Sequence, residues 1–508
     1  MRYDRESYRQ RLESKLANFI QTANIRDYPI NSSLADYYNE IINVGNYQKI
    51  HHEICKWMFD EAEHAKEIWI RIDEQDNIIS SENQENYSNE VERTYYRVTI
   101  LTQNMLDYDS MMFNLIAEEH ADDNSGENGY ATNMYKPFFF NFLIDINDNP
   151  HAIGFLSNPE NINQWFIGRF SEKGNGLSGY VERIASPAEY NDGIIEISDK
   201  RLPPSVIQNI NEVYDLGKKP CSSDIVVQME LVRILERPEF SKARIYNIGN
   251  GNCIYLKGRN SFGDIKMLYD IGYYHNAVPP KTITNKIYLP SITAIRSLRP
   301  QCVIISHWDS DHFYGCAYAD PAVFQCKWIA PDLGDNENVS ARRVARYLQV
   351  MKKIILVDRS FGRQIASIKG FNSKLNLYLG EKKRGKDIGI SPQNKEGIIL
   401  EYFNGYPRFT HTFMAGDVPY ESIPSIANFS YYTPYDYLVV PHHGSNMETR
   451  LISKPSLGKG YAIVCAKKGR LSPTHRTKLG ENYEVNETGE AKLCIDIDLL
   501  NKRAPRKR

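Results

Sequence analysis

The stretch VIISHWDSDHFYG, residues 303–315, follows an apolar run with two His and two Asp within six positions. On an extended backbone His307, Asp309 and Asp311 would point to the same side, and His312 would begin a turn beside Asp311. Crowding two carboxylates is costly unless a cation neutralises them. Because imidazole and carboxylate are ordinary ligands of Zn and Mn, the stretch indicates a metal site or, alternatively, a solvated polar loop.

Two further apolar runs end in the same residue types. Residues 410–422, THTFMAGDVPYES, end a run on Asp417, and residues 436–446, DYLVVPHHGSN, end another on His442 and His443. A solvated loop would have to be explained separately at each of the three strand ends. The three together favour a metal site where the strands stop.

Composition sets broad limits on the class of protein. The chain has 508 residues, with 24% charged residues and a net charge of −2, so any attraction for polyanions must come from a local patch. The start lacks the apolar core of a signal peptide, and no run of about 18 apolar residues occurs. The eight Cys form no C-x-x-C pair. We therefore expect a cytoplasmic protein with reduced cysteines and no membrane segment.

The region 1–240 differs from the rest in its helical apolar spacing and its many Tyr and Asn. We expect a mostly helical α+β region there, which could divide near 117–131. Apolar spacing predicts helices over 8–20, 33–42 and about 50–72, and a further helix from about Asp224 to Glu236. Strands are expected at 136–146 and 193–198, but no fold is indicated for 131–240. The many Tyr and Asn suit either a core or the recognition surface of a partner or sensor module.

After residue 241 short apolar runs repeat, separated by loops and by a helix expected at SARRVARYLQVMKK, 340–353. This alternation predicts a large α/β domain with two sheets over 241–500, followed by a basic, disordered tail at 501–508. The runs expected to form strands are 243–249, 252–258, 266–272, 302–308, 327–331, 353–358, 375–380, 397–403, 409–417, 437–444, 461–467 and 491–498.

The order of these motifs resembles a known family. NIGNGNCIYL (247–256), LYDIG (268–272), SHWDSDHFYG (306–315), FTHTFMAGD (409–417), VVPHHGS (439–445) and PTH (473–475) are similar to the metallo-β-lactamase superfamily, whose motif is H-x-H-x-D-H followed by an isolated Asp and an isolated His. More narrowly, they resemble the soluble hydrolase domain of bacterial DNA-uptake competence channels and its free-standing relatives. The resemblance covers about half of the chain and implies an αββα sandwich with metals at one edge.

The resemblance also implies roles for individual residues. His307 and Asp309 would face a first metal position, Asp417 would bridge, and Asp311, His312 and His442 would hold a second metal. Asp270, Asn394 and His443 would support these ligands from behind, with His442 preferred over His443 as the ligand of its pair. His475 would lie near the scissile group, where it could stabilise charge or protonate a leaving oxygen.

Two departures from the superfamily pattern bear on the metals. Asp309 stands where most members have His, and a separate ligand His is missing, since only His411 lies between His312 and His442. His411 would be about 20 Å along the strand from Asp417, which makes it structural. The narrower family holds an Asn-bearing turn instead, here at Asn394. We expect one tight and one loose divalent ion, Zn or Mn, or Mg at the oxygen-rich position.

The reaction expected from this site is hydrolysis by metal-bound hydroxide, with Asp311 or Asp417 orienting the water and His475 assisting the leaving group. The HHGS and PTH motifs favour DNA or RNA as substrate. Basic runs at 341–346, 381–386, 467–470 and 475–478 could form a phosphate-binding rim or be solvated faces. The candidate substrate-binding residues are Lys467, Lys468, Arg470, Arg476 and Ser445, and the aromatics that could stack on bases or pack in the core are Trp308, Phe313, Tyr314, Tyr431 and Tyr432.

Two alternatives remain open at this level. The chain could hydrolyse a small phosphoester or a cyclic nucleotide signal, because a fold does not select a substrate. It could also be a catalytically weak scaffold whose N-terminal half binds a protein. A nuclease joined to a sensing module would suit a bacterial defence or stress role.

Overall fold

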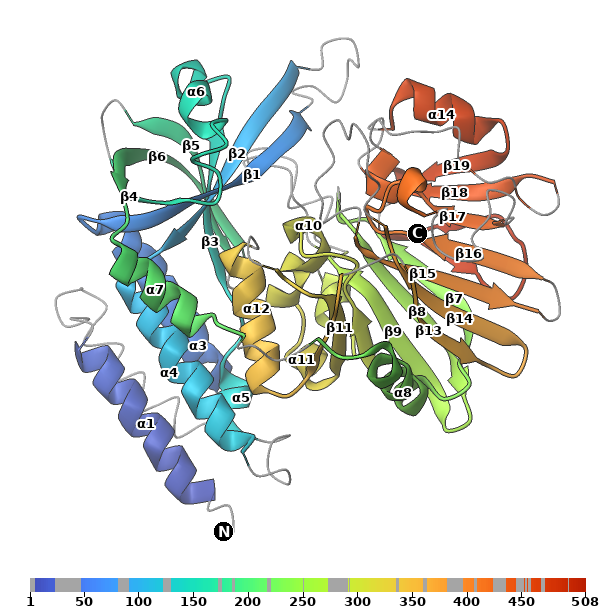
Figure 1. Cartoon of the computed structure of the whole chain (residues 1–508), viewed down its shortest axis with the longest axis horizontal. Coiled ribbons are helices and arrows are strands. Elements are labelled where there is room, and N and C mark those ends of the chain that lie inside the picture. The colour runs from blue at the N-terminus through green and yellow to red at the C-terminus, as the bar shows by residue number, and fades with distance from the viewer. Residues whose placement is uncertain are drawn as a thin grey trace. The chain divides into compact units, whose positions relative to one another are not determined.

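The protein is described by a computed structural model (Figure 1). It covers residues 5–508 except 23–46, 81–90, 122–128, 172–175, 185–187, 217–220, 250, 273–290, 292, 335–337, 360–362, 382–395, 406–408, 424–434, 445–451, 453–454, 456–457, 467–470 and 492. The chain forms two compact units. The first comprises Met1–Gly217, Ala277–Pro280 and Asn338–Lys352, and the second comprises Lys218–Asn276, Lys281–Glu337 and Lys353–Arg508.

The first unit contains the helices α1 (Arg5–Thr22), α3 (Tyr47–His64), α4 (Gln103–Glu119), α5 (Tyr130–Met134), α6 (Ile153–Leu156) and α7 (Pro204–Val213). Helix α1 confirms the prediction for 8–20, whereas the helix predicted over 33–42 lies outside the described residues. The prediction of one helix over 50–72 was wrong: α3 ends at His64, and a strand begins at Ile68. The Ile-rich run there pairs on both sides with other strands, and this pairing overrides its helical spacing.

Six strands of the first unit close into a barrel in the order β1-β2-β3-β5-β6-β4. They are β1 (Ile68–Ser80), β2 (Val91–Leu101), β3 (Phe139–Asp145), β4 (Trp165–Phe170), β5 (Leu177–Ile184) and β6 (Ala188–Arg201). Strands β3 and β6 confirm the strands predicted at 136–146 and 193–198. The barrel carries polar side chains that are buried, such as Asn141, whose Nδ2 donates to Glu182 Oε2 at 2.8 Å. Buried polar residues of this kind interrupt the apolar alternation by which strands are recognised.

Helix α12 (Val339–Val350) confirms the helix predicted at 340–353, and it belongs to the first unit although the chain on either side belongs to the second. Arg343 of α12 is 1% exposed. Its Nε lies 2.7 Å from Asp109 Oδ2 of α4, and its guanidinium lies over the ring of Phe138, 4.3 Å from the centroid. A buried ion pair therefore fixes this helix within the first unit.

The second unit contains two sheets. The eight-stranded sheet has the order β12-β11-β10-β9-β8-β7-β20-β21, and the seven-stranded sheet has the order β13-β14-β15-β16-β17-β18-β19. The bounds are β7 (Glu239–Tyr246), β8 (Cys253–Asn260), β9 (Gly263–Ile271), β10 (Cys302–Ile304), β11 (Lys327–Pro331), β12 (Ile354–Val357), β13 (Arg363–Lys369), β14 (Ser373–Leu379), β15 (Ile398–Asn404), β16 (Thr410–Met414), β17 (Tyr437–Val439), β18 (Gly460–Val464), β19 (Tyr483–Glu487), β20 (Cys494–Asp498) and β21 (Arg506–Lys507). Each of the runs predicted as strands overlaps one of these strands.

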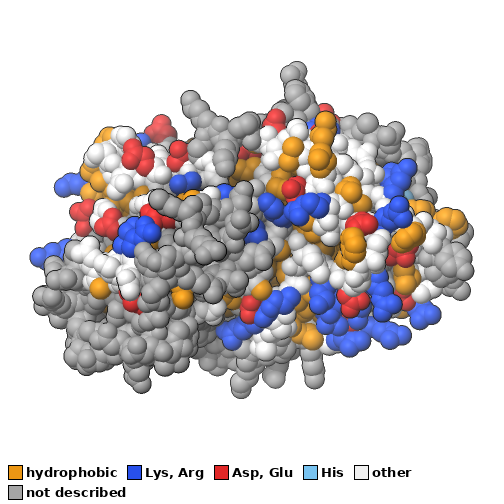
Figure 2. Space-filling model, turned by 90° about the horizontal axis from the view of Figure 1, so that it is seen from below, with side chains coloured by type: hydrophobic (Ala, Val, Ile, Leu, Met, Phe, Trp, Pro, Cys, Tyr) orange, Lys and Arg blue, Asp and Glu red, His pale blue; other side chains and the backbone are white. Residues whose placement is uncertain are grey.

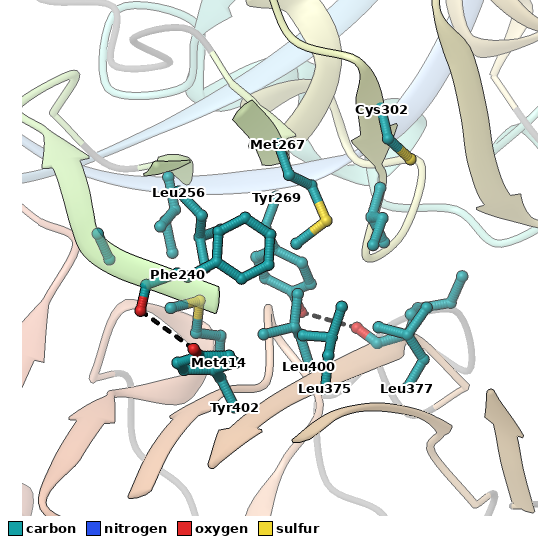
Figure 3. Close-up of a cluster of buried hydrophobic side chains, with 14 of the residues drawn as sticks. Phe240, Leu256, Met267, Tyr269, Cys302, Leu375, Leu377, Leu400, Tyr402 and Met414 are labelled. Carbon is teal, nitrogen blue, oxygen red and sulfur yellow. Dashed lines mark hydrogen bonds between the residues drawn. The ribbon is translucent and has the colours of Figure 1, made fainter. Parts of the chain in front are cut away.

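The two sheets of the second unit share one hydrophobic core (Figure 3). Phe240, Leu256 and Met267 of the eight-stranded sheet meet Leu375 and Leu400 of the seven-stranded sheet, and all five are buried. Two tyrosines tie the layers together: Tyr269 Oη donates to the carbonyl of Ile398 at 2.7 Å, and Tyr402 Oη donates to the carbonyl of Phe240 at 3.1 Å. Burial of this shared apolar surface, at roughly 25 cal/mol per Å², is the main force holding the sheets together.

The second unit also contains α8 (Asp224–Leu235), α10 (Ser310–Phe313), α11 (Ala322–Gln325) and α14 (Pro473–Gly480). Helix α8 confirms the helix predicted from Asp224 and packs on β13. The expectation of a disordered tail was wrong, because Arg506 and Lys507 form strand β21 beside β20. No helix among the described residues is long and apolar enough to cross a membrane.

Candidate metal centre

The His and Asp residues of the candidate centre follow four strands at their C-terminal ends. Strands β9 and β10 are parallel neighbours in one sheet, as are β16 and β17 in the other. Asp270 is near the end of β9, the stretch from His307 to His312 follows β10, Asp417 follows β16, and the His442–His443 pair follows β17. Because the C-terminal ends of parallel neighbours lie at the same edge, each sheet presents two of these segments together.

The two edges meet through a main-chain hydrogen bond. The Ile398 N–H of the seven-stranded sheet donates to the carbonyl of Ser306, which follows β10 of the other sheet, at 2.8 Å. Within the seven-stranded sheet, the His442 N–H donates to the carbonyl of Gly416 at 3.1 Å. Asp309 is still extended, but α10 begins at Ser310, so Asp311 and His312 lie on a helical turn. The expectation of an extended backbone through Asp311 was therefore wrong.

Three imidazoles and two carboxylates converge behind these strand ends. His443 Nε2 lies 3.0 Å from Asp311 Oδ2 and 3.5 Å from Asp417 Oδ1. His312 Nε2 lies 3.1 Å from Asp417 Oδ1 and 3.7 Å from Asp311 Oδ1, and His307 Nε2 lies 4.0 Å from Asp417 Oδ2. Two groups have ligand atoms within 4.8 Å of one another: His307, His312 and Asp417, and Asp311, His312 and His443.

Each of the three imidazoles is held by its Nδ1 atom, so that Nε2 faces the cluster. His312 Nδ1 donates to Asp270 Oδ2 at 2.9 Å, and His443 Nδ1 donates to the carbonyl of Cys465 at 2.8 Å. His307 Nδ1 lies 3.0 Å from Ser306 Oγ, which in turn donates to Asp270 Oδ2 at 2.9 Å. Hydrogen bonds of this kind fix the tautomer that leaves Nε2 available as a metal ligand.

The electrostatics of the cluster are those of paired opposite charges. Burial alone would raise the pKa of Asp311, but His312 and His443 outweigh it and lower this pKa to about 2. Burial is likewise opposed at Asp417, where the same two imidazoles hold the pKa well below its usual range. The carboxylates raise the pKa of His312 and of His443 against the opposing effect of burial. Without a metal, protons on these imidazoles supply the charge that the carboxylates require.

The residues present fit a divalent metal ion. Among the described residues, four buried atoms of the cluster, His307 Nε2, His312 Nε2, His443 Nε2 and Asp417 Oδ1, make no hydrogen bond of good geometry. This holds although His443 Nε2 and His312 Nε2 lie 3.0 and 3.1 Å from carboxylate oxygens. Buried polar atoms in native proteins nearly always have a partner, so four such atoms in one place need an explanation. Ligands about 2.1 Å from a tetrahedral ion lie about 3.4 Å apart, close to the separations observed here. A cation in contact with these atoms would satisfy them.

The local backbone depends on close approaches at two glycines. A Cβ atom on Gly272 would lie 1.8 Å from the carbonyl oxygen of Asp311, so that no larger residue fits beneath the turn. Gly416, with φ +57°, is in the left-handed region, and a Cβ there would lie 2.5 Å from Ser306 Cβ. His442 and His443 also have positive φ, at 49° and 53°. Such conformations are strained for side chains other than Gly and are often found at functional sites.

The adjacent histidines differ in their places. His443 is 7% exposed and belongs to one of the two ligand groups. The side chain of His442 is 26% exposed, and its Nε2 lies 3.8 Å from Asp417 Oδ2 on the outer side of the cluster. Asp309 is also at the rim, with Oδ2 3.2 Å from His307 Nε2 and a side chain 34% exposed. The geometry thus favours His443 over His442 as the inner ligand.

The structure describes two of the other residues predicted for the site. His475 is buried, and its Nε2 lies 3.1 Å from Tyr420 Oη. Arg476 forms an ion pair with Glu487. Ser445, Lys467, Lys468, Arg470 and Asn394 lie outside the described residues. Sequence reasoning missed Ser306 and Tyr420, because a hydroxyl carries no ligand signal; the direct adjacency of Ser306 to His307 was the only available hint.

Three of the aromatic residues and part of the first basic run are buried. Trp308, Phe313 and Tyr314 are at most 1% exposed, which supports core packing over stacking on bases. Tyr431 and Tyr432 lie outside the described residues, as does most of the run at 381–386. The run at 341–346 lies on α12 in the first unit, where Arg343 is buried. That run is therefore not a fully solvated face.

No protein-family model matches this chain, and no curated protein matches it significantly. Among solved structures, a point mutant of CmlA beta-hydroxylase is similar over 78% of this chain and 83% of its own, at 11% identity and a TM-score of 0.27. A likeness that distant assigns neither fold nor function.

Proposed function

We propose that this protein is a metal-dependent hydrolase, a nuclease or phosphodiesterase acting on DNA or RNA, whose second unit is an αββα sandwich of the metallo-β-lactamase type. The observation that carries the proposal is the buried convergence of three imidazole Nε2 atoms on two carboxylates. The motif order that resembles the superfamily supports the same class. Phosphodiester chemistry rests on the narrower resemblance of the HHGS and PTH stretches alone.

The ligands divide into an inner and an outer group. Asp311, His312, His443 and Asp417 would hold one divalent ion, since their ligand atoms are 3.0–3.7 Å apart and three of the four side chains are buried, Asp311 being 17% exposed. His307 and Asp309, with the second oxygen of Asp417, would hold another ion more weakly, because Asp309 is partly exposed. A bound divalent ion would polarise a phosphoryl oxygen and lower the pKa of a water molecule toward neutrality.

Asp270 lies behind the ligands and fixes their orientation through hydrogen bonds. Asp270 accepts from the Ser306 N–H at 2.6 Å as well as from His312 Nδ1, so this carboxylate fixes both the loop and the ring. The fixed ring directs Nε2 inward without a conformational search at each turnover. Asp270 is thus a positioning residue rather than a catalytic one.

Elemental analysis of the purified protein, paired with cleavage assays in Mn, Zn and Mg, tests the proposal. We expect bound divalent metal and cleavage of plasmid or single-stranded DNA or RNA. Asp417→Asn should lose metal and lower the rate by a factor on the order of 100 or more. The matched control is His411→Gln on β16, the strand that precedes Asp417, since His411 Nε2 lies 3.5 Å from Glu401 Oε1 and outside both ligand groups.

The outcomes separate the candidate functions. Full activity and metal content in Asp417→Asn would overturn the metal centre. Cleavage of cyclic nucleotides, with neither nucleic acid cleaved, would favour the small-phosphoester hydrolase. Absence of metal and of any cleavage would favour the scaffold.

A further inference from the structure

The outer face of the eight-stranded sheet carries a row of lysines. Lys242 on β7 is directly opposite Lys257 on β8, and Lys257 is directly opposite Lys266 on β9. Directly opposed residues of neighbouring strands point to the same side of a sheet. The other side of these strands is buried in the shared core, as Ala243, Leu256 and Met267 show. The three lysines therefore face away from the core.

More cations flank the lysine row. Arg244 follows on β7, and strand β21 adds Arg506 directly opposite Asp496 of β20. Asp496 is contacted by three cations, with its oxygens 2.7 Å from Lys242 Nζ, 2.8 Å from Arg244 Nε and 2.6 Å from Arg508 Nε. One carboxylate cannot neutralise three cations, and Arg503 is already the neighbour of Asp498, at 3.8 Å. The face keeps an excess of positive charge.

Two of the lysines have no anionic partner within the described residues. Their mutual repulsion is therefore not neutralised, and like charges directly opposite each other on neighbouring strands destabilise a sheet. Neither Lys257 nor Lys266 forms an ion pair there, and Lys257 Nζ lies over the ring of Tyr255 instead, 5.1 Å from its centroid. Burial, followed by repulsion from Arg244 and Lys266, lowers the pKa of Lys257. An external anion would relieve this repulsion.

The surroundings of the row favour one kind of anion. Phe262, at the tip of the β8–β9 hairpin that carries Lys257 and Lys266, is 82% exposed. Phe262 lies beyond the Lys257–Lys266 pair at the end of the same hairpin, where the register continues through Arg259–Asp264 and Asn260–Gly263. Proteins that bind single-stranded nucleic acid combine cations along the backbone with aromatic side chains on which bases stack. Figure 2 shows Lys and Arg side chains gathering at the lower right of one face, over the part of the chain that forms the two large sheets.

We propose that Lys242, Lys257, Lys266, Arg506 and Arg508 form a nucleic-acid-binding face, in which the lysine row contacts backbone phosphates and Phe262 contacts a base. The choice of nucleic acid as the ligand rests on the proposed function. The proposal of an anion-binding face rests only on the cations that the strand register aligns across neighbouring strands. This face would bind a polymeric substrate through residues outside the candidate metal centre. Binding of this kind raises the local substrate concentration, and the residues involved take no part in the chemistry.

Binding of a labelled oligonucleotide, single-stranded and duplex, to the full chain in EDTA tests the face without hydrolysis. Lys257→Gln/Lys266→Gln should raise the Kd on the order of tenfold and reduce the slope of log K against log salt by about 1.4 for single strands and about 1.8 for duplex. Phe262→Ala should weaken single-strand binding more than duplex binding. Glutamine is chosen because it removes the charge while keeping a polar side chain that is only one atom shorter than that of lysine.

The matched control is Lys369→Gln/Lys374→Gln, because these two lysines are also directly opposed, on β13 and β14 of the other sheet. It should leave both Kd and salt slope unchanged. Equal weakening by the two double variants, or an unchanged slope in Lys257→Gln/Lys266→Gln, would overturn the proposal. So would cosedimentation with phosphatidylglycerol vesicles in place of oligonucleotide binding. Binding in EDTA by a protein without nuclease activity would support the face and refute only the hydrolase.

Discussion

Replacing Arg343 with Met should strongly destabilise the first unit, because the guanidinium is surrounded by specific partners. Nε lies 2.7 Å from Asp109 Oδ2, Nη1 donates to the carbonyl of Phe138 at 2.7 Å, and Nη2 donates to Tyr214 Oη at 2.9 Å. Asp109 itself is fully buried and also accepts from Tyr135 Oη and Tyr214 Oη at 2.7 and 2.6 Å. The variant would leave that carboxylate without its cation.

The magnitude follows from the charge left behind. Breaking one side of a buried ion pair costs about 3–5 kcal/mol, and the lost cation–π contact with Phe138 could add up to about 2 kcal/mol. Asp109 keeps two hydroxyl donors and can take up a proton, which limits the loss, so we expect about 3–5 kcal/mol in total. Since domains are stable by roughly 5–15 kcal/mol, this is a large fraction of the whole.

Urea unfolding followed by circular dichroism measures this effect, with the transition of the first unit analysed separately because a chain of two units need not unfold in one step. Arg343→Met/Asp109→Asn should recover at least half of the loss, since the amide oxygen still accepts from the tyrosines and no charge is stranded. Arg346→Met, on the same helix but only partly buried, is the control and should cost less than about 1 kcal/mol. A loss below 1 kcal/mol in Arg343→Met would refute the reasoning.

Three further predictions concern the metal centre. His443→Ala should lower metal content more than His442→Ala, measured by elemental analysis, because His443 is the inner imidazole. Gly272→Ala should lose metal while keeping its far-ultraviolet circular dichroism, since the added Cβ would displace Asp311; unchanged metal content would contradict this. In the metal-free protein, the pKa of Asp311 is lowered to about 2, so its contribution to the free energy of unfolding is complete above the unfolded value of about 3.9 and is lost as the pH falls toward 2. The pKa of His312 is raised, so its contribution is complete below about 6.5 and is lost as the pH rises through the folded value. The melting temperature in EDTA should therefore be highest between about pH 4 and 6.5, and metal binding should release protons.

Most strand positions in the second unit could be predicted because most of these strands are short apolar runs that must be buried. The residue types of the centre could be predicted for a related reason: His307, Asp311, His312 and Asp417 come directly after such runs, and the structure brings them together. Strands β13 and β19 were missed because RQIASIK and YEVNE carry more polar than apolar residues. Their pairing with β14 and β18, not their composition, makes them strands.

The first unit was harder to predict because its decisive contacts join distant residues. Nothing near Arg343 in the sequence shows that it pairs with Asp109, and without that contact ARRVAR is an ordinary basic helix. The barrel was hidden for the same reason, since Asn141 and Glu182 satisfy each other across strands and neither alone indicates burial.

The sequence by itself determined where most strands of the second unit run and which strand ends carry His and Asp, because apolar burial and ligand chemistry are properties of local residue types. Only the tertiary structure decided which neighbour of a pair turns inward. His442 and His443 are chemically identical, and the left-handed backbone at both, together with the carbonyl of Cys465, directs one ring to Asp311 and the other to the rim. Such a choice depends on atoms contributed by other strands, which no local pattern records.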